Sequence, residues 1–181
     1  MGVGREPKPS KLFMSLILTE DSVFQQGLQD LRLTFGETDF VSERFAFDLT
    51  DYYSKEMGPN LFRHFIAFEF LIPPSSLPEI KQTTNRLEGK YIHSQGSRRM
   101  NIDPGYVCLE HVILATTKGY THRPYLRDGI YADLTLIYQK GSYRPLEWTY
   151  PDYRQPEIIS LFNRLRGTYV EVLKRRTDHP C

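Results

Sequence analysis

The chain has only two cysteines in 181 residues, Cys108 and Cys181, and this scarcity excludes two classes of small protein. Two cysteines cannot build the disulfide framework of a small secreted domain, and neither they nor the five scattered histidines show the spacing of zinc ligands. A chain with so little cysteine suits a reducing compartment, so we expect a cytoplasmic location.

An excess of charge of one sign is also missing, since 23 basic and 22 acidic residues leave a formal net charge of +1. The net charge therefore does not indicate a nucleic-acid partner, although it does not exclude a local basic face. Long apolar runs are missing too, because the run from Leu12 to Leu18 is too short to span a membrane. We expect no membrane partner. The chain also has no phosphate-cradling glycine loop, which excludes a P-loop nucleotide hydrolase.

Aromatic residues are abundant, with 12 Tyr and 11 Phe against one Trp. A hydrophobic content of 40% and a charged content of 25% are typical of a globular protein that can build its own core. Phenylalanine is expected inside that core and tyrosine at its edge, where the hydroxyl can reach a ligand. We predict one domain over residues 11–176, with a flexible arm at 1–10 and a flexible tail at 177–181.

The pattern of apolar residues predicts strands at 12–18, 43–49, 63–72, 106–115, 130–138 and 143–148. Helices are expected to begin near Ser22 and Ser76, each with a capping box, and near Pro156. The first six elements match the ferredoxin-like βαββαβ unit. We therefore predict an α+β fold: an antiparallel or mixed sheet with a ferredoxin-like βαββαβ core, helices mainly on one face, and a C-terminal hairpin and helix.

Several longer motifs follow one another along the chain: Thr50-Asp51-Tyr52-Tyr53, Asn101-Ile102-Asp103-Pro104-Gly105-Tyr106, Ala115-Thr116-Thr117-Lys118, His122-Arg123, Gly129-Ile130-Tyr131-Ala132 and Trp148-Thr149-Tyr150-Pro151-Asp152-Tyr153-Arg154. On these motifs the chain resembles DUF4416, a bacterial and archaeal family of unknown function, over nearly its whole length. The resemblance implies a small single-domain prokaryotic protein. It assigns no catalytic residue, so candidates must come from chemistry.

Two acidic residues are candidates for a metal or acid–base site. Asp103-Pro104-Gly105 has the composition of a turn, in which Asp103 either caps its own turn or presents a rigid carboxylate. Asp51 either caps a short helical turn or supplies a second carboxylate to the same site. If Asp51 and Asp103 met in space, they could bind Mg²⁺ together with phosphate oxygens, or move a proton.

A basic run is expected on the loop after the strand at 106–115. It holds Lys118, His122, Arg123 and Arg127, with Thr117 as a hydroxyl donor. Such groups suit a phosphate or carboxylate ligand, but a solvated hairpin loop would have the same composition. His122 is the candidate acid–base residue of this group.

Other polar and aromatic residues could line the walls of such a pocket. The segment before the last helix either attaches that helix to the sheet or walls a pocket, and both alternatives stay open. The candidate ligand-binding residues outside the basic run are Asn101, Tyr106, Tyr131, Tyr153 and Arg154.

These candidates predict a pocket for a phosphorylated or nucleotide-like small molecule, which the protein binds and, if it is an enzyme, hydrolyses or transfers. The alternative is a non-catalytic module that binds RNA or another protein through the exposed face of its sheet. The sequence decides neither the ligand nor the oligomeric state.

Overall fold

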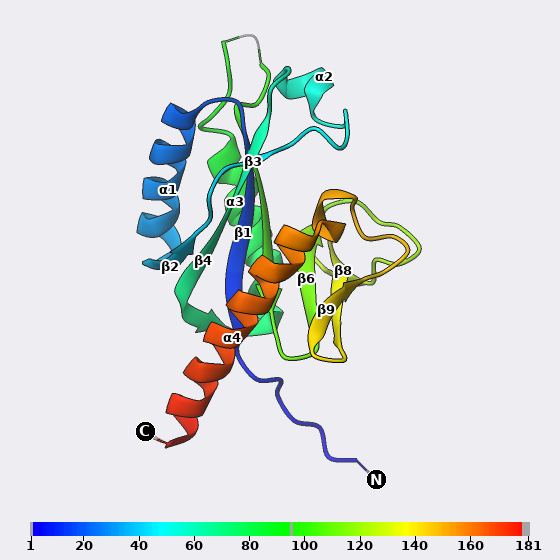
Figure 1. Ribbon diagram of the computed structural model, residues 1–181. Helices are drawn as coiled ribbons and strands as arrows, with labels where there is room; N and C mark the ends of the chain where they lie inside the picture. Colours follow the sequence, from blue (N-terminus) through cyan, green and yellow to red (C-terminus); the bar gives the residue numbers. More distant parts are fainter. Residues whose placement is uncertain (1, 95, 179–181) are drawn as a thin grey trace.

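The computed structural model describes residues 2–94 and 96–178 (Figure 1). Its strands are β1 (Ser10–Leu18), β2 (Thr38–Val41), β3 (Phe45–Ala46), β4 (Phe62–Ile72), β5 (Met100–Val107), β6 (His111–Thr116), β7 (Tyr125–Arg127), β8 (Ile130–Gln139) and β9 (Ser142–Pro145). Its helices are α1 (Asp21–Phe35), α2 (Ser54–Met57), α3 (Leu77–Glu88) and α4 (Pro156–Asp178), with 3-10 turns η1 (Pro74–Ser76) and η2 (Asp152–Arg154). The predicted α+β class is confirmed.

All the strands belong to one sheet with the order β2-β4-β1-β5-β6-β8-β7, in which β3 also pairs with β4 and β9 with β8. Every pair of neighbouring strands is antiparallel. The first four strands in this order come from the predicted βαββαβ part of the chain, and its ferredoxin-like label stays a prediction.

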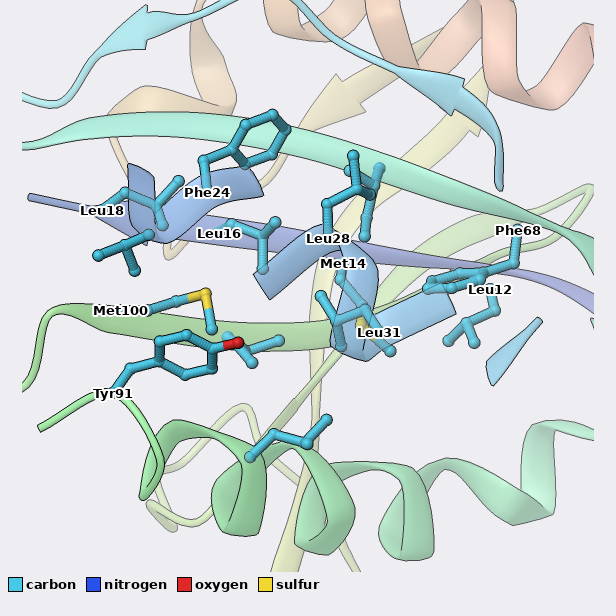
Figure 2. Close-up of a cluster of buried hydrophobic side chains, with 14 of the residues drawn as sticks. Leu12, Met14, Leu16, Leu18, Phe24, Leu28, Leu31, Phe68, Tyr91 and Met100 are labelled. Atoms are coloured by element: carbon cyan, nitrogen blue, oxygen red, sulfur yellow. The ribbon is translucent and has the colours of Figure 1, made fainter. Parts of the chain in front are cut away.

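Helices cover both faces of this sheet. Alternate residues of β1, from Leu12 to Leu18, pack against α1 and α3, and Figure 2 shows them gathered with Phe24, Leu28 and Leu31 of α1. On the opposite face Phe13 packs against Phe162 of α4, which crosses the front of the sheet in Figure 1. The helices α1 and α3 thus share one face, as expected, while α4 covers the other. The reason is visible in β1, which is buried along its whole length and must be covered on both sides.

Several predicted boundaries are wrong, and each error has a local cause. The strand expected at 106–115 is a hairpin of β5 and β6, in which the Cys108 N–H donates to the His111 carbonyl at 3.0 Å. Its central residues, Leu109 and Glu110, are not the types that mark a turn, so the sequence pattern does not indicate it. The strand expected at 43–49 is reduced to the short β3, preceded by the separate β2.

The predicted capping boxes do not form. The Ser22 hydroxyl donates to Glu20 and the Ser76 hydroxyl to the Pro73 carbonyl, so neither side chain caps a helix. The predicted stop of α1 at Gly36 is confirmed, because Gly36 has a φ of 92°, which favours glycine.

Both ends of the described chain lie toward the same end of the sheet, well apart from each other in Figure 1. Residues 2–9 form no helix or strand, and α4 runs through to Asp178, so residues 179–181 of the predicted tail fall outside the described residues. The helix α4 is 23 residues long and carries charged residues between its apolar positions. Within residues 2–94 and 96–178, no helix combines the length and apolar character needed to cross a membrane.

Candidate functional site

The strands β5 and β6 separate toward one end of the sheet, and a pocket of about 500 Å³ lies between them. They pair only from Gly105–Leu114 to Val107–Val112, next to their connecting turn. Beyond Gly105, β5 continues along β1 alone, while β6 continues along β8. Residues that follow β6 and residues of β5 therefore face each other across an opening rather than across a hydrogen-bonded ladder.

Pro104 explains where the β5–β6 ladder stops. Because Cys108 donates to His111, the alternation of an antiparallel ladder points the backbone nitrogens of Tyr106 and then Pro104 toward β6. Proline has no N–H to donate, so pairing ends at this position. The prediction that Asp103-Pro104-Gly105 forms a turn is therefore wrong: the segment is strand throughout, paired with β1. Its composition is that of a turn, but pairing with a distant strand decides the conformation.

Two charged side chains of α3 replace β6 along the separated part of β5. The Ile102 N–H donates to Glu88 Oε1 at 2.7 Å, and the Ile102 carbonyl accepts from Lys81 Nζ at 2.8 Å. Both side chains are buried. Without them, two buried backbone groups would lose their partners. Burial raises the pKa of the Glu88 carboxyl, and the nearby Lys81 ammonium opposes that rise.

We expect Lys81→Met to lower the free energy of unfolding by about 1–3 kcal/mol, because the buried Ile102 carbonyl would lose its donor. Lys90→Met is the matched control near the end of the same helix, since the Lys90 side chain is 60% exposed and pairs with Asp30 at the surface. The control should lose no more than about 1 kcal/mol. Urea denaturation measures both, and equal losses would contradict this role of Lys81.

Carboxylates around the pocket are each paired with a cation. Lys81 Nζ lies 3.2 Å from Asp103 Oδ1, and Asn101 Nδ2 donates to Asp103 Oδ2 at 2.7 Å. The remaining pairs are Arg98 with Glu88 at 2.7 Å, Arg123 with Asp133 at 2.7 Å, and Arg63 with Asp152.

Lys118 is the exception among the lining cations. Five cationic and four acidic side chains line the pocket, so one positive charge is left over. Lys118 Nζ lies 4.3 Å from the centre of the Tyr52 ring, and within the described part of the chain it forms no ion pair. The pocket therefore carries one uncompensated positive charge at the loop after β6.

Aromatic rings form much of the wall. Tyr52 and Tyr53 come from the segment that leads into α2, and Tyr150 comes from the loop before η2. The Tyr150 hydroxyl accepts a hydrogen bond from Arg123, and burial is the main cause that raises its pKa to about 12. The Tyr150 hydroxyl therefore stays protonated at neutral pH and can donate a hydrogen bond.

Six of the predicted site residues line this pocket: Asn101, Asp103, Thr117, Lys118, Arg123 and Tyr153. Asp51 does not join them, because it lines a different hollow beside Asp48 and Ser54. Its side chain does not cap α2 either. Among the described residues, no three His, Cys, Asp or Glu side chains gather as metal ligands. The Mg²⁺ site of Asp51 and Asp103 stays a prediction.

The other predicted site residues do not line the pocket, and most of their contacts are with residues outside it. His122 stacks on Trp148 with ring centres 5.1 Å apart, and its Nε2 lies 3.7 Å from Asp133 Oδ2. Arg127 pairs with Glu79 and Asp128, and Arg154 donates to the carbonyls of Thr149 and Glu147. Tyr106 packs against His111, and Tyr131 packs against Tyr125.

Sequence reasoning missed the lining residues of α3 and β4. Lys81 and Glu88 fall on the same helical face as Leu77, Ile80 and Leu87, which is the buried face of α3. Charged residues inside an apolar stripe were the available indication. Arg63 likewise interrupts the apolar pattern of β4 and is buried there.

Comparison with known protein families gives one match for this chain. A family model described as "Domain of unknown function (DUF4416)" matches residues 8–169, which include every strand of the sheet and all the lining residues. The comparisons with curated proteins and with solved structures gave no match. Because the matched region covers nearly the whole chain, the protein belongs to the DUF4416 family.

Proposed function

We propose that the pocket between β5 and β6 binds a phosphorylated or nucleotide-like small molecule. One observation carries the proposal: Lys118 faces the pocket with a positive charge that no carboxylate of the described chain balances. A phosphate or carboxylate group of a ligand would supply the missing negative charge. Arg123 also lines the pocket, but Asp133 already balances its charge.

The dimensions and walls of the pocket support a ligand larger than a bare anion. A volume of about 500 Å³ falls within the range typical of small-molecule sites. The rings of Tyr52, Tyr53 and Tyr150 offer surfaces on which a planar group can stack. Thr116 and Thr117 add hydroxyl groups beside Lys118, and the Thr116 hydroxyl accepts from the Lys118 N–H at 3.2 Å, which orders this turn.

Asp103 is the residue best placed for chemistry on a bound ligand. Its two oxygens are held by Lys81 and Asn101, so the carboxylate has a fixed orientation in the pocket. A carboxylate held in this way can accept hydrogen bonds from ligand hydroxyls. If the protein hydrolyses or transfers a phosphoryl group, Asp103 would accept the proton of the attacking hydroxyl or water.

We expect Lys118→Met to weaken binding of nucleoside monophosphates about 10- to 100-fold, because it removes one charge-assisted contact to the phosphate. Isothermal titration calorimetry with inorganic phosphate and the common nucleoside 5′-monophosphates measures the affinities. Lys174→Met is the control, since Lys174 is an exposed residue of α4 and does not line the pocket. Unchanged affinity in the Lys118 variant, or no binding of any of these probes to the wild-type protein, would rule out the proposal.

The RNA- or protein-binding alternative stays a prediction. It relied on an exposed sheet face, whereas helices cover both faces of β1. A macromolecular partner would therefore need a surface other than the centre of the sheet.

A further inference from the structure

The Asp103 carboxylate borders the opening between β5 and β6. Asp103 lies opposite Ser15 in the β1–β5 ladder, so the two side chains share one face of the sheet. Phe13, two residues before Ser15, packs against α4, which places Asp103 on the α4 side. Two positions beyond the last β5–β6 pair, Asp103 lies across from Thr116, and both residues line the pocket. Lys118 follows two residues later, so the carboxylate and the spare positive charge border the same opening.

Asp103 keeps acceptor capacity that the protein does not use. A carboxylate can accept about four hydrogen bonds, two on each oxygen. Within the described residues, Oδ1 is bonded by Lys81 at 3.2 Å and Oδ2 by Asn101 at 2.7 Å. One acceptor position therefore remains on each oxygen. The Asp103 side chain is 26% exposed and lines the pocket, whereas the Lys81 side chain is 7% exposed. A ligand in the pocket can thus reach Asp103 while Lys81 holds it from behind.

The local charges favour hydroxyl donors over a second cation at Asp103. The Lys81 ammonium already balances this carboxylate, and a cationic ligand group would also meet the spare charge of Lys118 in the same pocket. Two O–H groups on neighbouring carbons match the two free positions, because each carboxylate oxygen can accept one of them. Ribose carries such a pair at C2′ and C3′. An acidic residue accepts a ribose hydroxyl in the same way in dinucleotide-binding folds.

We infer that the pocket binds ribonucleotides in preference to deoxyribonucleotides, with the 2′ and 3′ hydroxyls of the ribose donating to Asp103. The phosphate binds Lys118, and the base stacks on the tyrosine rings of the wall. A 2′-deoxy sugar keeps the phosphate and the base but leaves one acceptor position of Asp103 without a donor. This inference rests on the proposed function, because it names the class of substrate that the same site takes.

Ribonucleoside 5′-monophosphates and their 2′-deoxy counterparts test the preference one base at a time, since each pair differs only at C2′. We expect each ribonucleotide that binds to do so at least about tenfold more tightly in calorimetry, because it donates one more hydrogen bond to a charged acceptor. Compared with adenosine 5′-monophosphate, 3′-deoxyadenosine 5′-monophosphate should lose a similar factor, since it lacks the other hydroxyl of the pair.

Three variants assign the preference to Asp103. Asp103→Asn should reduce the ratio of ribonucleotide to deoxyribonucleotide affinity about three- to tenfold, because the amide has one acceptor oxygen and no charge. The ratio compares two ligands on one protein, so a loss of stability in the variant does not produce this result. Lys118→Met should weaken both nucleotides and keep their ratio. Asp48→Asn is the control, since Asp48 is exposed and does not line the pocket, although Phe47 and Leu49 on either side of it do.

The outcomes separate this inference from the proposed function. Equal binding of ribonucleotides and deoxyribonucleotides, or tighter binding of the deoxy forms, would overturn the ribose preference and leave anion binding at Lys118 intact. A ratio that Asp103→Asn leaves unchanged, or that Asp48→Asn lowers as much, would also overturn it. Binding of inorganic phosphate but of no nucleotide would have the same meaning. Failure of every nucleotide and of inorganic phosphate to bind would remove this inference together with the proposed function.

Discussion

Arg63→Ala lowers the free energy of unfolding by about 3–5 kcal/mol, the largest loss that we expect from truncating a side chain around the pocket. Arg63 pairs with Asp152, and the two side chains are only 8% and 14% exposed. Removing the guanidinium leaves a buried carboxylate without its counter-charge. The variant also loses packing, because the guanidinium lies over the rings of Phe47 and Tyr153, 4.8 and 5.1 Å from their centres.

Urea denaturation of Arg63→Ala and Arg44→Ala separates the buried pair from an exposed one. Arg44 also lies over a ring, that of Phe62 at 3.8 Å, but its partner Asp21 is exposed. The Arg44 variant should lose no more than about 1 kcal/mol. Adding Asp152→Asn to Arg63→Ala should recover part of the loss, because the isolated charge is removed. Equal losses from the two arginine variants would show that the Arg63–Asp152 pair stabilises the protein no more than a surface ion pair does.

Gly105→Ala is the second large effect, with an expected loss of about 3 kcal/mol. A Cβ at this position would lie 2.7 Å from the Phe13 ring and would collide with the Ile113 carbonyl. The carbonyl belongs to the backbone of β6, so the strain must be relieved by moving a strand. Gly105–Leu114 is the last β5–β6 pair before the strands separate, and the substitution should lengthen the opening.

Gly167→Ala is the matched control for Gly105→Ala. Gly167 lies within α4, and a Cβ there would have no atom within 4 Å. Alanine should therefore stabilise the protein by about 0.5–1 kcal/mol through the higher helix propensity. Chemical denaturation of the two variants should give opposite signs. A Gly105→Ala variant as stable as the wild-type protein would contradict the close approach of β5 and β6.

Much of the fold could be predicted because some patterns are local. The period from Ile158 to Leu173 identifies α4, and the apolar run from Leu12 to Leu18 identifies β1. The conformation of Asp103-Pro104-Gly105 could not be predicted in this way. Its residue types favour a turn, and only pairing with β1, which lies far away in the sequence, holds it extended.

The site was predictable where its residues lie close together in the sequence. The basic loop contributes Lys118 and Arg123, and both line the pocket. His122 lies between them in the sequence but stacks on Trp148 outside the lining, because consecutive residues of an irregular loop point in different directions. The contributions of α3 and β4 depend on how distant elements meet, and composition does not determine that. Asp51, chosen for its chemistry alone, lines a separate hollow.

The short β5–β6 ladder also has a mechanical consequence. It joins the strands β2-β4-β1-β5 to the strands β6-β8-β7. The ladder lies beside the turn that connects β5 and β6, and the far ends of these two strands share no backbone hydrogen bonds. A small rotation about this ladder would move the far ends of β5 and β6 most. A change in the width of the opening would break no β5–β6 backbone pair, because these pairs lie only at the other end. The side chains that span the opening, with their rotatable bonds, would follow that movement.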